Sequence, residues 1–98
     1  MRNEFYAWIA SIVADANEIS CEELSGYSKV QEIVEAKMML CHFCTRAGMS
    51  AKSIASHINR TQEAVSHLVR SYNDRYSTSG IFRAVADDVR NRIEMIDK

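Results

Sequence analysis

Polar side chains recur along residues 62–70 at spacings that place them on one side of a helix. They are Gln62, Glu63, Ser66, His67 and Arg70. Groups of these types can exchange hydrogen bonds with base edges in the major groove of DNA, whereas cations hold the phosphates. The pattern therefore predicts recognition chemistry on an exposed helix. The cations expected at phosphates are Lys52, Arg60 and Arg70.

Two of these side chains have distinct expected roles. The amide of Gln62 can pair bidentately with adenine, so we expect Gln62 to read a base. Glu63 would repel phosphates unless it accepts a hydrogen bond from a cytosine amino group. It also has a purely structural interpretation, because a carboxylate near a helix N-terminus gains ~0.3–1 kcal/mol from the macrodipole. His67 is open to both readings, as a base contact or simply an exposed residue.

Residues 50–76 are expected to position this surface as a short helix, a tight turn and a longer helix. Asn59 tolerates the left-handed conformation that ends a helix, and Thr61 can cap the next one. Small Ala55 would let the second helix cross the first. The apolar positions fit the inward side of a helix-turn-helix. They are Ile54, Ala55, Ile58, Val65, Leu68 and Val69.

The remaining chain predicts an all-α fold of about five to six helices. An amphipathic helix is expected over residues 4–17, and a short one within residues 19–26, with Ser20 and Glu23 as a capping box. A long central helix should span residues 29–47, introduced by Ser28 and Gln31 and ended by Gly48. After a polar break at residues 77–80, a last helix should cover residues 81–96.

The composition limits the number of domains and the fold class that this chain can form. The chain has 98 residues, 47% of them hydrophobic, with no Pro and three Gly, which favours one helical domain over residues 1–98. No run approaches the ~18 apolar residues of a membrane span, and the N-terminus lacks a secretory signal pattern. We expect a cytoplasmic protein without a membrane partner.

Charge is uneven along the chain although the net charge is only -1. Residues 1–45 carry three basic against seven acidic side chains, whereas residues 46–76 carry five against two. The positive charge therefore coincides with the predicted helix-turn-helix, where a phosphate footprint is expected.

Cys41, His42 and Cys44 form a CHFC cluster that has a metal-site and a packing interpretation. Packing is favoured, because the cluster lies inside a predicted long helix and no second pair of cysteines accompanies it. His57 is likewise expected to be a partly exposed helix residue. No nucleophile elbow or phosphate loop is present, so we expect no catalytic residue, no metal and no small-molecule cofactor.

The sequence ISCEELSGYSKVQEIVEAKMML at residues 19–40 resembles part of the C-terminal DNA-binding domain (domain IV) of DnaA, the bacterial replication initiator. Gly48, Met49 and Ser50, then Val65 and His67, resemble the family's helix-turn-helix, and IFRAVADDVRNRIE its final helix. The resemblance implies a Trp-repressor-like helix-turn-helix fold and contact with double-stranded DNA. It also adds Lys29, from the family's minor-groove loop, and Lys37, which replaces an Arg, to the expected DNA contacts, along with Thr61 at the start of the recognition helix.

The departures from DnaA are equally informative. At the start of the recognition helix the family has Gly-Gly-Arg-Asp-His-Thr-Thr-Val, whereas this chain has NRTQEAV, one residue shorter. The basic loop keeps only Lys29, and the ATPase domain is absent from this sequence. Recognition of the family's origin repeat is therefore not implied.

Two functions remain open. The first is binding of double-stranded DNA in replication or transcription, without ATPase activity. The second is a protein-interaction module that kept the fold and lost DNA binding, using the acidic N-terminal half or the aromatic first helix.

Overall fold

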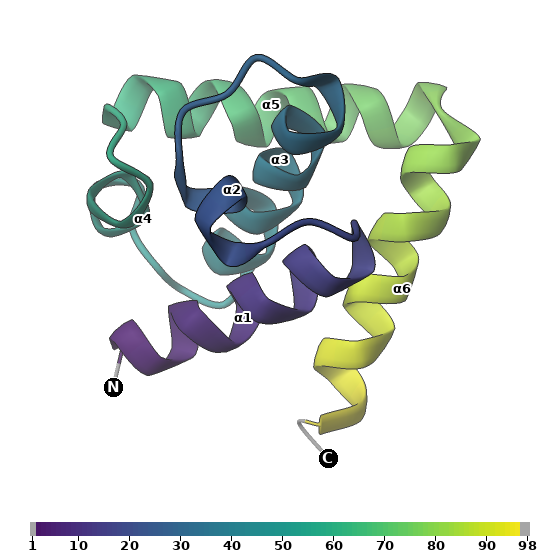
Figure 1. Ribbon diagram of the computed structural model, residues 1–98, viewed down its shortest axis with the longest axis horizontal. Helices are drawn as coiled ribbons and strands as arrows, with labels where there is room; N and C mark the ends of the chain where they lie inside the picture. Colours follow the sequence, from purple (N-terminus) through teal and green to yellow (C-terminus); the bar gives the residue numbers. More distant parts are fainter. Residues whose placement is uncertain (1, 97–98) are drawn as a thin grey trace.

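The computed structural model describes residues 2–96, which form six helices and no strand (Figure 1). The helices are α1 (Arg2–Ala16), α2 (Cys21–Ser25), α3 (Gln31–Arg46), α4 (Ala51–Ile58), α5 (Gln62–Thr78) and α6 (Gly80–Ile96). The predicted all-α class is confirmed over this part of the chain. None of these helices combines the length and the apolar character needed to cross a lipid bilayer.

α3 is the central helix, as its apolar sequence predicted. Its buried side chains point to several sides instead of one stripe, and α3 contacts α1, α2, α4, α5 and α6. Figure 1 shows α3 enclosed between α5 and α1, with α6 leading from the end of α5 down past α1. The largest fully buried side chains on α3 are Met39, Leu40, Cys41 and Cys44.

Several helix ends follow their local sequence signals. Ser20 and Glu23 form the predicted capping box at α2. Gly48, with φ of 103°, ends the α3 segment, and Asn59 ends α4 in the left-handed region with φ of 57°. These positions were identifiable because capping residues and left-handed conformations depend on few neighbours.

Two boundary predictions were wrong. α3 begins at Gln31, and its N-cap Val30 makes no side-chain cap. The Ser28 hydroxyl instead accepts from the Val30 N–H at 3.1 Å, which closes a turn before the helix. The expected break at residues 77–80 shrinks to Ser79, because the hydroxyls of Ser77 and Thr78 donate to carbonyls one turn back and remain helical.

Ser79 itself separates α5 from α6. It has extended backbone, with φ of −122° and ψ of 114°, and its hydroxyl accepts from the Phe82 N–H at 3.2 Å. This bond satisfies one of the free N–H groups at the start of α6. α5 and α6 are therefore joined without a flexible loop.

Aromatic rings connect α3, α5 and α6. Tyr72 of α5 stacks on His42 of α3, with ring centroids 3.7 Å apart and planes 9° apart. Phe82 of α6 meets Tyr72 at 5.4 Å, and the Tyr76 hydroxyl donates to Asp87 at 2.7 Å. Tyr72 and Phe82 are buried, so this cluster fixes how α5 lies on α3.

Cys41 and Cys44 are fully buried within the same core. Burial raises the pKa of each thiol to about 12, so both are protonated at neutral pH. Their environment fits the interpretation that they pack as small apolar groups.

His42 gives a testable consequence of this packing. Burial, and then the guanidinium groups of Arg46 and Arg90, lower its pKa to about 4 from 6.5. Between these values the unfolded chain binds the proton and the folded chain does not, so the free energy of unfolding should fall as pH drops from 6.5 towards 4. The fall over this window should be smaller in His42→Gln.

The direct measurement is an NMR titration of the imidazole protons. We expect the His42 resonance to titrate near pH 4, and a midpoint at the ordinary 6.5 would contradict the buried stacked arrangement.

Candidate nucleic-acid interface

α4 and α5 are held at a fixed angle by the turn at residues 59–61. The Arg60 N–H donates to the Ala55 carbonyl at 3.0 Å, which closes the end of α4. Thr61 is the N-cap of α5, and its hydroxyl accepts from the Ala64 N–H at 3.1 Å. The predicted left-handed residue and the predicted cap are both present.

The inward side of this pair matches the predicted apolar stripe. Ile54, Ala55, Ile58 and Val65 are buried, and Leu68 and Val69 are partly buried against the core. Ala55 is 5% exposed, in keeping with a small residue between crossing helices. Burial on this side determines which face of α5 remains in solvent.

The outward face of α5 carries the residues expected at base edges. Gln62, Glu63, Ser66, His67 and Arg70 are all exposed. Within residues 4–95, whose side chains the structure describes, these five side chains make no hydrogen bond or ion pair with other parts of the chain. The structure thus brings these five residues together on a surface that the fold leaves uncovered.

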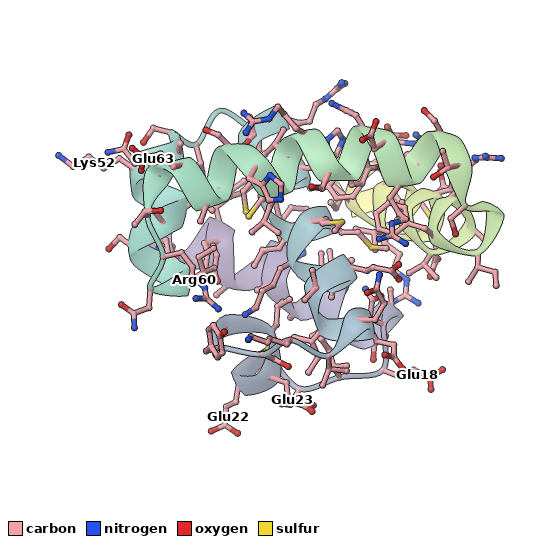
Figure 2. All side chains as sticks on the ribbon, turned by 90° about the horizontal axis from the view of Figure 1, so that it is seen from above. Glu18, Glu22, Glu23, Lys52, Arg60 and Glu63 are labelled. Atoms are coloured by element: carbon pink, nitrogen blue, oxygen red, sulfur yellow. The ribbon has the colours of Figure 1, made fainter. Side chains whose placement is uncertain are left out.

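Figure 2 shows how charges lie around this face. Lys52 of α4 projects from the same end of the molecule as Glu63 of α5. Glu18, Glu22 and Glu23 lie across the molecule from α5. These three carboxylates therefore do not screen the outward face of α5.

Arg60 occupies a more constrained position than expected. Its guanidinium carbon lies 4.3 Å from the centroid of the Tyr27 ring, a cation–π contact, and the residue is partly buried. Tyr27 and the exposed Lys29 belong to the segment between α2 and α3. The contact holds this segment against the turn, a role for Tyr27 that the sequence reasoning missed, since no local pattern pairs residues 27 and 60.

Lys37 does not belong to the surface and is a correction to the expected DNA contacts. It is 3% exposed, and its ammonium group donates to the Gly26 carbonyl oxygen. Burial and then the neighbouring Arg60 charge lower its pKa. The Lys37 side chain serves the fold, because it satisfies a loop carbonyl beneath the surface and does not reach towards a phosphate.

Two other cations of residues 46–76 contribute less positive charge near α5 than the sequence indicated. Arg75 pairs with Glu35 at 3.3 Å, so the count of positive charges over residues 46–76 overstates the free charge near α5. Arg46 is exposed but ends α3, outside α4 and α5. Of the cations expected at phosphates, Arg70 lies on α5, Lys52 on α4 and Arg60 in the turn between them, whereas Lys29 lies in the segment between α2 and α3.

His57 follows its predicted structural role. Its ring stacks on Tyr6 of α1, with centroids 4.0 Å apart and planes 9° apart, and the residue is partly buried. The contact attaches α4 to α1. His67, by contrast, is exposed on α5.

The sequence matches no known protein-family model and has no significant similarity to a curated protein. The resemblance to the DnaA domain therefore rests on the quoted residues.

The Thr61 cap can be tested for its structural role. Thr61→Ala should lower the free energy of unfolding by about 1 kcal/mol, because the N–H of Ala64 loses its acceptor. Thr61→Ser keeps a hydroxyl and should stay close to the parent protein. Urea denaturation followed by circular dichroism measures both, and an equal effect of the two changes would contradict the cap.

Proposed function

We propose that this domain binds double-stranded DNA, with α4 and α5 acting as a helix-turn-helix and α5 lying in the major groove. The observation that carries the proposal is the outward face of α5, where five polar side chains are exposed and have no partner among the described side chains of residues 4–95. A helix in this role presents its N-terminal half to base edges while its partner helix crosses the backbone. The overall arrangement would be of the Trp-repressor-like kind that the DnaA resemblance implies.

The position of each polar residue along α5 suggests its role in DNA binding. Gln62, in its first turn, and Ser66 and His67, one turn later, are the candidates to contact bases. Glu63 lies in the first turn as well, where its carboxylate complements the helix macrodipole and can accept from a cytosine amino group. The residues proposed to contact bases therefore all lie within residues 62–67, at the N-terminal end of α5.

Phosphate contacts would come from both sides of that stretch. Lys52 extends from the first turn of α4, and Arg70 lies further along α5. Arg60 is pre-positioned by Tyr27, which lowers the conformational entropy lost on binding. Lys29 would approach the adjacent backbone or minor groove from the segment beside it.

A second candidate is a protein-interaction module. The pairing of Arg75 with Glu35 and the burial of Lys37 favour it, since both remove cations from the surface. Exposed Glu63 adds a negative charge at the proposed recognition end. A protein partner would then bind through the acidic N-terminal half or the aromatic first helix, α1.

Salt dependence of duplex binding separates the two candidates. We expect binding of a labelled random-sequence duplex, followed by fluorescence anisotropy, to weaken by about 40- to 150-fold between roughly 50 and 200 mM salt, as about three to four phosphate contacts require. Absence of binding at either salt concentration by folded protein would overturn the proposal and favour the interaction module.

Two matched variants test whether the outward face of α5 is the surface that binds DNA. Arg70→Gln should weaken binding to every duplex and reduce the slope of log affinity against log salt by about 1. Arg92→Gln removes the same charge from α6, where the guanidinium bonds Asp15 at 2.7 Å, and should leave binding unchanged. Equal losses in both variants would show a general charge effect and exclude the proposed docking.

A further inference from the structure

A cavity of about 280 Å³ lies between α1, the end of α3 and α6. Its apolar lining includes Phe5, Trp8, Phe43 and Ile93, and its charged lining consists of Arg46, Arg90 and Glu94. Phe5, Trp8 and Ile93 are only partly buried, so their apolar surface is accessible from this cavity. None of the residues on the outward face of α5 contributes to it.

A second hollow of about 290 Å³ adjoins the first, because His42, Arg46 and Arg90 line both. The second hollow continues over Tyr72 and Tyr76 of α5. Two guanidinium groups and one imidazole therefore stand where the hollows meet, with aromatic rings on either side. This combination of apolar walls and a few convergent polar groups is typical of small-molecule sites.

Charged groups of both signs line the first cavity. Arg90 bonds Asp87 at 2.8 Å, and Glu94 also lines the first cavity. Arg46 forms no ion pair within the described part of the chain. Because the pKa of His42 is lowered to about 4, its ring is neutral at pH 7. Arg46 is thus a cation beside the apolar part of the cavity that has no ion-pair partner in the described chain, and Glu94 is a carboxylate of the same lining that has none either.

We propose that this cavity binds a small apolar carboxylate, an aryl or short alkyl acid, with its carboxylate on Arg46 and its apolar part among Phe5, Trp8, Phe43 and Ile93. A planar guanidinium can bind a carboxylate through two parallel hydrogen bonds. An apolar cavity of about 150 Å³ is sufficient for benzene, so the volume here accommodates a phenyl ring with a short side chain. The inference is independent of DNA binding.

Trp8 provides the readout, since it is the only tryptophan of the chain. The probes are 3-phenylpropionate, the neutral 3-phenylpropanamide and the cationic 3-phenylpropylamine, each titrated at pH 7.5 without DNA. We expect a saturable change in Trp8 fluorescence with the acid, and an affinity roughly tenfold above that of the amide, because only the acid offers Arg46 a negative charge and two equivalent acceptor oxygens. Calorimetry gives the same ranking without relying on fluorescence.

Arg46→Gln should abolish the preference for the acid over the amide, and Arg70→Gln, the same change on the outward face of α5, should retain it. Both residues are exposed, and circular dichroism will verify that the variants are folded. Any of four results would overturn the proposal. These are no saturable binding of the acid up to on the order of 10 mM, equal affinities of acid and amide, tighter binding of the amine through Glu94, or an unchanged preference in Arg46→Gln.

Discussion

Helix α3 contacts every other helix of the described chain, and its burial is the constraint on which the rest of the structure depends. A helix buried on several sides needs apolar groups around its axis, which Met39, Leu40, Cys41 and Cys44 provide. Each neighbouring helix then buries one side against α3 or its contacts and leaves another side in solvent. The surface proposed to bind DNA is one of those outer sides.

α5 illustrates this relation between core and surface. Val65 and Tyr72 are buried, and the stacking of Tyr72 on His42 sets the rotation of α5 about its own axis. Because that rotation is fixed, the side chains of Gln62, Ser66 and Arg70 point into solvent. The polar face of α5 is therefore a direct result of aromatic packing on α3.

The sequence predicted features that depend on local chemistry. The Ser20 capping box, the left-handed Asn59 and the Thr61 cap each involve groups within a few residues of one another, so their spacing alone was sufficient. Most helices and the exposed residues of α5 followed in the same way from apolar periodicity. Which residues bind DNA stays a prediction, because exposure does not identify a partner.

Features that depend on distant neighbours were not predictable. Lys37 carries a charge in a helix with many apolar residues, and only the position of the Gly26 carbonyl shows that its ammonium group points inward. The pairing of Arg75 with Glu35 joins residues of two helices, and the Tyr27 contact with Arg60 joins a loop to a turn. The cavity beside Trp8 required α1, α3 and α6 to be placed together.

The connections between helices differ in length and exposure, and this difference has a consequence for chain cleavage. The α5–α6 connection consists of Ser79 alone, whereas residues 26–30 form an extended segment with Tyr27 69% exposed and Val30 52% exposed. Proteases cut preferentially at exposed irregular segments. An enzyme that cleaves after aromatic residues would thus divide the chain first at Tyr27, into one fragment with α1 and α2 and another with α3 to α6, and the shared core would hold the two fragments together.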